Sequence, residues 1–427
     1  MNRSEKILIL FGFINPVIYI LNANFLLMMI LIEILILMRQ KEERESKFWK
    51  IFLLGYSYFG VDILGIKLYD LVVLFGIPIF IKKRKHILNK STIIDIYILI
   101  IYIIYLTIIL VKSYLNGNNI AEYARYIFCF ALIILSWITL YDKKVIEKVL
   151  LFIRVMALKV IISGIMIGIL GVNGLIEYIY TSKLLNVKIH SIISEFRITA
   201  FFSDPNKMFL FLLSLLIIYE LYMYKKDKNN KVFDSTNIIL IIGSLISLSR
   251  TALLIVFTYI LLKVIYAKIL RNNSKNIIIM DILISIIIIV AFVFLKNILV
   301  EIIDYIILSI TKILGRDSTI SHTSSLLNDS RIISSKFALA SLSSNWVVGL
   351  GFEAWSELYY MPPHNTVVSI LQETGIIGLT LWISLFRKII LKVPAYIYVP
   401  LFLIPLLTFD LQTYRFIYIL LGFCIIL

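Results

Sequence analysis

Long apolar runs, separated by short charged or polar breaks, cover most of the chain. Runs of about 15–25 apolar residues repeat from residue 7 to the end, and this length suits a helix that crosses a bilayer. Transmembrane β-strands alternate apolar and polar residues in short segments, so the pattern does not indicate a barrel. We therefore predict an all-α, polytopic helical membrane protein with about 14 transmembrane helices, within a range of about 12 to 14.

Four of the predicted spans are short. Residues 7–21 and 25–38 predict a pair of short helices, with one long kinked helix as the alternative. A second short pair is predicted over residues 48–61 and 66–81. The remaining predicted spans are 92–111, 123–141, 145–171, 200–224, 237–248, 251–267, 277–295, 366–386, 393–409 and 411–427.

Clusters of Lys and Arg orient these spans, because such residues collect in cytoplasmic loops. The strongest cluster is Lys82-Lys83-Arg84-Lys85, which we place in the cytoplasm. The other dense basic clusters then fall on the same side, and both termini are predicted to be cytoplasmic. Orientation thus explains the net charge of +16, and we expect no nucleic-acid partner. Residues 1–6 precede an apolar run without a small-residue cleavage site, so residues 7–21 are predicted to be a membrane helix rather than a signal peptide.

The longest interval without a continuous apolar run is 296–365. We predict that it is one large extracytoplasmic loop within a single integral membrane domain, 1–427. It carries an unusual density of charged side chains for this protein, including Arg331, Glu353 and His364. Within it, residues 331–342 can form an amphipathic surface helix, and the two glycines of Gly349-Leu350-Gly351-Phe352 permit close backbone approach.

Other polar segments face outward under this topology. Arg197 precedes Asp204-Pro205-Asn206, which suits a plain helix start or a helix N-terminus that holds a phosphate. Arg250 lies between two apolar runs, where an arginine is costly unless it is paired or hydrated. His364-Asn365 stands at the outer mouth of a predicted helix, and Glu373 lies about 13 Å deeper. A carboxylate inside the membrane marks a functional site by default, although it can also simply pair with an arginine.

Several chemistries have no counterpart in the sequence. It contains no P-loop, no GxGxxG and no cytoplasmic segment large enough to form a nucleotide-binding domain. Cys129 and Cys424 lie inside apolar runs, and no His/Cys spacing suggests a metal site. We therefore expect no metal and no cofactor, and a substrate that carries its own activation.

Four motifs occur in a characteristic order: Arg197 through Asn206, Ser249-Arg250-Thr251, Gly349-Leu350-Gly351-Phe352, and His364-Asn365 through Glu373-Thr374-Gly375. Together they resemble the O-antigen ligase and polymerase superfamily, which includes the Wzy-type repeat-unit polymerases. The resemblance covers roughly residues 197–386. The sequence departs from the family pattern at Asp204, where Gly often precedes Pro-Asn.

The resemblance implies a metal-independent, inverting glycosyltransferase at the outer face of the bacterial inner (cytoplasmic) membrane. Its donor would be a glycan on a polyprenyl diphosphate (undecaprenyl diphosphate in bacteria). Its acceptor would be another lipid-linked repeat unit, as in O-antigen or capsular polysaccharide synthesis. Its partners would be the lipid bilayer and a chain-length regulator protein. The alternatives are a ligase that moves the finished glycan to another acceptor, and a flippase or exporter that performs no chemistry; the large outer loop and the lack of an internal repeat disfavour the flippase.

Such a reaction assigns roles to the outward-facing residues. Negative charge builds on the diphosphate as the glycosidic bond breaks, so arginines should surround it. The acceptor hydroxyl must lose a proton to a base. His364 is the first candidate for this catalytic base, with Glu353 and Glu373 as alternatives. The predicted diphosphate-binding and substrate-binding residues are Arg197, Arg250, Arg331, Asn206 and Asn365.

Overall fold

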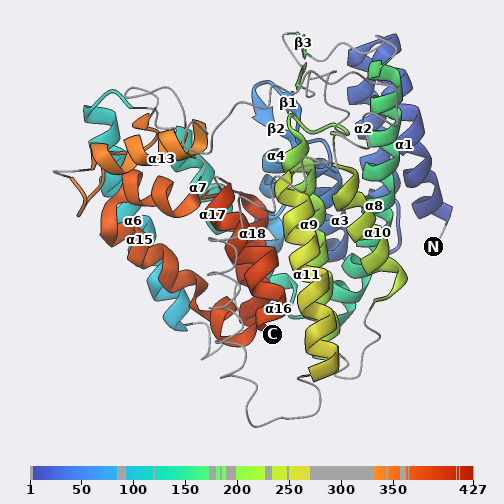
Figure 1. The fold of residues 1–427 in the computed structure, drawn as a ribbon. Coiled ribbons are helices and arrows are strands. Elements are labelled where there is room, and N and C mark those ends of the chain that lie inside the picture. Colours follow the sequence, from blue (N-terminus) through green and yellow to red (C-terminus); the bar gives the residue numbers. More distant parts are fainter. Residues whose placement is uncertain are drawn as a thin grey trace, which may run out of the picture. The chain divides into compact units, whose positions relative to one another are not determined.

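The computed structural model describes residues 3–83, 93–118, 121–172, 179–182, 185–188, 199–226, 233–247, 250–269, 330–342, 345–355, 362–363, 365–409, 411–412 and 414–426. These residues fall into two compact units, and Figure 1 labels most of their elements. The first unit comprises residues within 3–82 and 139–267, and the second comprises residues within 83–138 and 330–426.

The first unit is mainly helical. Asn22 ends the first helix and caps the second by accepting a hydrogen bond from the backbone N–H of Asn24 at 2.9 Å, so the predicted pair of short helices is confirmed over one kinked helix. The helices of this unit are α1 (Arg3–Leu21), α2 (Ala23–Met38), α3 (Arg44–Tyr56), α4 (Leu68–Leu74), α5 (Ile77–Lys83), α8 (Lys143–Val172), α9 (Pro205–Lys226), α10 (Ser235–Ile246) and α11 (Arg250–Ile269).

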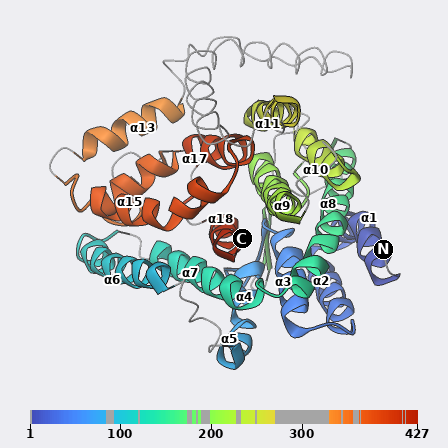
Figure 2. The same ribbon diagram turned by 90° about the horizontal axis from the view of Figure 1, so that it is seen from below.

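The second unit contains the two helices after the basic cluster at residues 82–85 and the helices of the C-terminal part of the chain (Figure 2). Short apolar helices with a π-helical turn occupy the predicted span 393–409, where prolines at 394, 400 and 405 interrupt regular helix. The elements of this unit are α6 (Ile93–Leu115), α7 (Ala121–Thr139), α13 (Ser330–Ser341), α15 (Thr366–Lys392), α16 (Ala395–Tyr398), the π-helix η4 (Val399–Leu403), α17 (Ile404–Thr408) and α18 (Arg415–Ile426).

Six helices in the described part of the chain are long and apolar enough to cross a membrane. They are Arg3–Leu21, Ile94–Leu115, Ala121–Thr139, Lys143–Leu170, Pro205–Tyr224 and Thr366–Arg387. Together with the shorter apolar helices they confirm an all-α, multi-pass membrane protein. The count of about 14 spans remains a prediction, and the predicted span at 277–295 lies outside the described residues. The same holds for the single domain 1–427 and for the loop 296–365, of which residues 296–329 are not described.

A small antiparallel sheet in the first unit was not predicted. Its strands are β1 (Val61–Ile63), β2 (Ile66–Lys67), β3 (Ile179–Thr181) and β4 (Leu185–Lys188), in the order β2-β1-β4-β3. A two-residue turn with positive φ at Leu64 and Gly65 joins β1 to β2, as tight hairpins require. The predicted helix over 66–81 is therefore wrong: this stretch starts as a strand and continues as α4 and α5, each only seven residues long.

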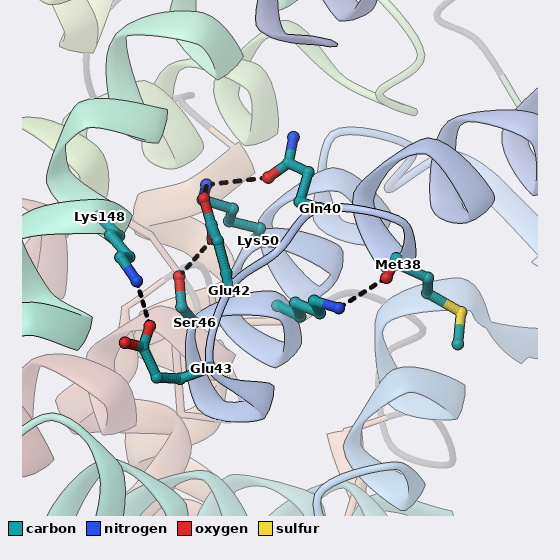
Figure 3. Close-up of polar contacts among 8 residues, drawn as sticks. Met38, Gln40, Glu42, Glu43, Ser46, Lys50 and Lys148 are labelled. Atoms are coloured by element: carbon teal, nitrogen blue, oxygen red, sulfur yellow. Dashed lines mark hydrogen bonds and ion pairs between the residues drawn. The ribbon is translucent and has the colours of Figure 1, made fainter. Parts of the chain in front are cut away.

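The charged break between α2 and α3 is a fixed turn (Figure 3). Lys50 is buried and donates hydrogen bonds to Glu42 at 2.7 Å and to Gln40 at 3.2 Å. Glu43 pairs with Lys148 of α8, and this hydrogen bond lowers the pKa of the Glu43 carboxyl below its ordinary value. Gln40, Glu42 and Glu43 of this break thus connect α2 to lysines of α3 and α8.

Candidate functional site

The long helix α15 is interrupted where the sequence predicted a continuous span. Gly375 has φ 66° and ψ −171°, a conformation that is open almost only to glycine. A helix that breaks inside the membrane exposes backbone N–H and C=O groups, and these must find partners within the protein. The break therefore needs another segment to cover it.

Residues 346–353, which contain the Gly349-Leu350-Gly351-Phe352 motif, cover this break. The N–H of Leu350 donates to the carbonyl of Gln372 at 2.7 Å, and that of Gly351 donates to the carbonyl of Glu373 at 3.0 Å. In the other direction, the N–H of Ile376 donates to the carbonyl of Trp346 at 2.9 Å. Backbone groups released by the break are thus satisfied by a segment that lies more than 20 residues earlier in the chain.

Glycine is required on both sides of this contact. A Cβ atom on Gly349 would lie 2.5 Å from the carbonyl group of Glu373, and a Cβ on Gly375 would collide with the carbonyl of Val347. Both glycines also have positive φ, 78° and 66°. The two C-terminal motifs that the sequence analysis singled out are therefore complementary halves of one packing arrangement.

The end of α6 and the turn to α7 hold the other side of this segment. Lys112 donates to the carbonyl of Gly349, and the N–H of Phe352 donates to the hydroxyl of Ser113 at 2.8 Å. Asn118 donates to the carbonyl of Leu350 at 3.4 Å. The Phe352 ring is fully buried and packs 5.9 Å from the ring of Tyr126. Residues 346–353 are consequently clamped between α15 and the α6–α7 turn.

Glu373 lies under this segment with no exposed surface. Its Oε1 accepts a hydrogen bond from the backbone N–H of Glu353 at 3.1 Å and a second from Nε2 of Gln412 at 3.1 Å. Gln412 itself is buried just before α18, and its backbone carbonyl accepts a hydrogen bond from the hydroxyl of Tyr418. The intramembrane carboxylate that the sequence pointed to thus bonds to the backbone of a second predicted site residue.

Glu353 is held at both its backbone and its side chain. Its φ of 48° is uncommon for a residue with a side chain. Its carboxylate accepts a hydrogen bond from Arg125 of α7 at 2.9 Å, and Arg125 also pairs with Glu122. The side chain of Glu353 is 14% exposed and that of Arg125 is 47% exposed, so this ion pair reaches the surface of the unit, whereas Glu373 does not.

Asn365 has a local structural role. Its side-chain oxygen accepts hydrogen bonds from the backbone N–H groups of Val367 at 3.0 Å and Val368 at 3.2 Å, which makes it the N-cap of α15. Its amide donates to the carbonyl of Leu407 at 3.2 Å. Its predicted contact with substrate remains a prediction.

The remaining predicted site residues are described only in part. The amphipathic helix predicted at 331–342 is present as α13, and Arg331 is its second residue. α13 lies against α15, where Nε2 of Gln372 donates to Ser341 at 3.2 Å. His364 lies outside the described residues, although the hydroxyl of Ser335 on α13 bonds to the carbonyl of Pro363, the residue before it, at 2.7 Å.

In the first unit, the predicted helix start at Asp204-Pro205-Asn206 is present. α9 begins at Pro205, and Asp204 accepts a hydrogen bond from the N–H of Asn206 at 2.6 Å. Arg250 is the first residue of α11, and Arg197 lies outside the described residues. The described geometry brings Glu353 and Glu373 together in the second unit, and it places Asn206 and Arg250 in the first.

Sequence reasoning missed Arg125, Glu122 and Gln412. The first two stand three residues apart at the start of an apolar run, and a charged pair at that spacing on a predicted membrane helix was the available signal. Gln412 gave no signal of its own, since it lies near the start of the predicted span 411–427 among other polar residues. In the described part of the chain, no three His, Cys, Asp or Glu side chains are grouped so that they could bind a metal ion.

Among the comparisons with known proteins, a family model matches part of the chain. Residues 236–383 match the model of a family described as O-antigen ligase. This interval includes Arg250, the segment 346–353 and the break in α15. No curated protein and no solved structure matches the chain significantly.

Proposed function

We propose that this chain, whose residues 236–383 match the O-antigen ligase family, is a member of the O-antigen ligase/polymerase superfamily and a polymerase of lipid-linked oligosaccharide repeat units. It would act as an inverting glycosyltransferase, with a polyprenyl-diphosphate-linked glycan as donor and a lipid-linked repeat unit as acceptor. The observation that carries this proposal is the family match, which spans three of the four motifs found in the sequence. The interlocking of the two C-terminal motifs across the break in α15 supports it.

The reaction is a displacement at the anomeric carbon of the donor. An acceptor hydroxyl oxygen forms a bond to that carbon, the bond from the carbon to the diphosphate oxygen breaks, and the polyprenyl diphosphate leaves with the bonding electron pair. The hydroxyl proton passes to a base. We assign the stabilisation of the leaving diphosphate to Arg197, Arg250 and Arg331, because developing negative charge is best met by fixed cationic donors.

The base is assigned to His364, with Glu353 as the alternative. A histidine has an ordinary pKa near neutrality, so it can accept a proton at physiological pH. Replacement His364→Ala is expected to lower turnover by about a hundredfold or more, within the range that general bases contribute. Normal turnover of this variant would remove His364 from the mechanism.

The orientation in the membrane follows from the basic clusters. We place the reaction at the extracytoplasmic face of the bacterial inner membrane, with both termini in the cytoplasm. The substrate would then be a lipid-linked unit already on the outer leaflet. A chain-length regulator would be a natural further partner of a polymerase at this face.

The test is a reconstitution in vesicles with a synthetic polyprenyl-diphosphate repeat unit as the only glycan. A polymerase yields a ladder of longer lipid-linked products together with free polyprenyl diphosphate. If the donor is consumed only when a different acceptor is added, the protein is a ligase. If neither product forms, the proposal is wrong.

A ligase is the second candidate, because the matched family carries that description. Deletion of the gene separates the two in cells. Glycans that stop at a single capped repeat indicate a lost polymerase, and long uncapped lipid-linked chains indicate a lost ligase. Accumulation of the lipid-linked unit on the cytoplasmic side would instead indicate a lost flippase.

A further inference from the structure

Two carboxylates of the second unit, those of Glu353 and Glu373, occupy different environments. Glu373 is fully buried, and its Oε1 is bonded to two donors of the protein, the N–H of Glu353 and the amide of Gln412. Glu353 reaches the surface of the unit beside the half-exposed Arg125. A group that accepts or donates a proton in catalysis must come within hydrogen-bonding distance of the substrate. Glu353 has surface that a substrate could contact, whereas Glu373 has none.

We propose that Glu373 is a positioning residue: its buried carboxylate fixes the backbone at Glu353 and thereby aims the Glu353–Arg125 pair at the acceptor sugar. This inference rests on the glycosyltransferase activity proposed above. It gives Glu373 a role distinct from that of a catalytic base, and it makes Arg125 a partner of Glu353 in contacting the substrate.

The backbone geometry explains why Glu353 needs such an anchor. Residue 353 has a left-handed φ of 48°, and it follows Gly351 at φ 107° and the buried Phe352. A residue with a side chain keeps this conformation only when its surroundings over-determine it. The N–H of Phe352 is fixed by Ser113, and the next N–H, that of Glu353, is fixed by Glu373. Two successive backbone anchors set the direction in which the Glu353 side chain leaves the segment.

The break in α15 is what brings the carboxylate to this place. Gly375 interrupts the helix immediately after Glu373 and Thr374, so residues 346–353 can approach the helix backbone directly. The backbone N–H of Gly351 donates a hydrogen bond to the carbonyl of Glu373, and the N–H of Glu353, two residues later, donates to the carboxylate of Glu373. One residue therefore holds the segment through both its backbone and its side chain.

A glutamine at position 373 separates positioning from acid–base catalysis. Glutamine can keep its amide oxygen in the place of Oε1, where it still accepts hydrogen bonds from the N–H of Glu353 and from Nε2 of Gln412. We expect Glu373→Gln to retain turnover within about tenfold of the wild type, and Glu373→Leu to lose about a hundredfold or more, as displaced catalytic groups do. Equal, severe losses in both variants would show that Glu373 itself transfers a proton and would overturn the inference.

A second measurement reads the backbone at residue 353 without any need for activity. In a chain with Cys129→Ala and Cys424→Ala, the substitution Glu353→Cys reports its own exposure through its rate of reaction with a water-soluble maleimide. We expect Glu373→Leu to raise this rate about tenfold or more and Glu373→Gln to leave it within about twofold, as expected when local opening exposes a segment. The matched control is Ser369→Ala, a buried polar side chain one turn away on the same helix, which should change neither this rate nor turnover.

The two measurements distinguish the possible failures. If the wild type does not elongate the lipid-linked unit, the proposed function fails, while the maleimide reactivity of the Glu353→Cys chain still tests the positioning. If adding Glu373→Leu to that chain leaves its reactivity unchanged, Glu373 does not hold this segment and the inference is wrong. If Glu353→Gln elongates at the wild-type rate, Glu373 has no catalytic group to position, and the inference is equally wrong.

Discussion

Arg250 begins α11, and it lies inside the interval that matches the O-antigen ligase family. A cation at the start of a membrane helix is costly unless it has an anionic partner or water. A diphosphate that gains charge as the glycosidic bond breaks is such a partner. The diphosphate role proposed above for Arg250 would supply such a partner.

Replacement of Arg250 by alanine is expected to reduce turnover by about a hundredfold to a thousandfold, the usual loss when one donor to a developing oxyanion is removed. The control is Arg39→Ala, an exposed arginine at the α2–α3 turn, which should keep the wild-type rate. Elongation of the lipid-linked repeat by reconstituted protein measures both. A normal rate for Arg250→Ala would remove this residue from the diphosphate site.

A second residue-scale feature is the buried ion pair between Glu33 of α2 and Lys159 of α8. Neither side chain is more than 2% exposed. Glu33 also accepts hydrogen bonds from Asn15 at 2.6 Å and from Tyr58 at 2.7 Å, and Lys159 donates to Tyr58 at 2.9 Å. The desolvation cost of both charges is offset only while both partners are present.

We expect Lys159→Met to destabilise the protein by about 3–5 kcal/mol, because it leaves the Glu33 charge buried without a cation. The double variant Glu33→Gln with Lys159→Met removes both charges and should recover most of that loss. The control is Lys148→Met, which breaks the exposed pair with Glu43 and should cost about 1 kcal/mol or less. Thermal unfolding in detergent ranks these variants, and a double variant less stable than Lys159→Met would contradict the argument.

At the scale of elements, the break in α15 depends on one glycine. An alanine at Gly375 would have to adopt φ 66° with ψ −171°, and its Cβ would collide with the carbonyl of Val347. A helix that closes over the break instead would lose its hydrogen bonds with residues 346–353. Either outcome displaces the segment that carries Glu353.

Gly375→Ala is therefore expected to abolish elongation and to lower the unfolding temperature. Gly117→Ala is a matched control, because Gly117 has a similar φ of 75° but open space where a Cβ would lie. That variant should lose only about 1 kcal/mol of stability, because alanine disfavours a left-handed φ, and it should stay active. Equal behaviour of the two variants would mean that the contact between the two motifs does not matter.

The sequence predicted the elements best where the signal is local. The cap at Asp204, the helix pair around Asn22 and the amphipathic helix α13 follow from capping residues and periodicity, which act within a few positions. The break at Gly375 was missed because a single glycine in an apolar run is compatible with a continuous helix. The break is stabilised by contacts with residues 346–353, more than 20 positions earlier in the chain, and no local sequence pattern reveals such contacts.

At the scale of the whole molecule, the sequence predicted the class of protein and the motifs but not how they combine. Apolar run length alone indicates a multi-pass helical membrane protein. The pairing of Glu353 with Arg125 joins residues 228 positions apart, and that of Glu373 with Gln412 joins residues 39 positions apart. Such contacts depend on how helices pack, and packing is set by the complete chain rather than by any one stretch.

The contacts of residues 346–353 also bear on which side of the membrane the site faces. Lys112, Ser113 and Asn118 belong to the end of α6 and its turn into α7, which the basic clusters predict to be extracytoplasmic. The other end of α7 leads to Asp142-Lys143-Lys144, which the same rule places inside. A substrate on the outer leaflet could meet Glu353 only if this orientation is correct.

Single cysteines before and after α7 test that orientation in a chain with Cys129→Ala and Cys424→Ala. Asn116 and Lys143 are both exposed, so Asn116→Cys and Lys143→Cys give a matched pair. A membrane-impermeant maleimide should label Asn116→Cys in intact cells, and should label Lys143→Cys only after the cells are opened, since the charged reagent does not cross the bilayer. The reverse pattern would place the Glu353–Arg125 pair on the cytoplasmic side and exclude transfer from an outer-leaflet donor.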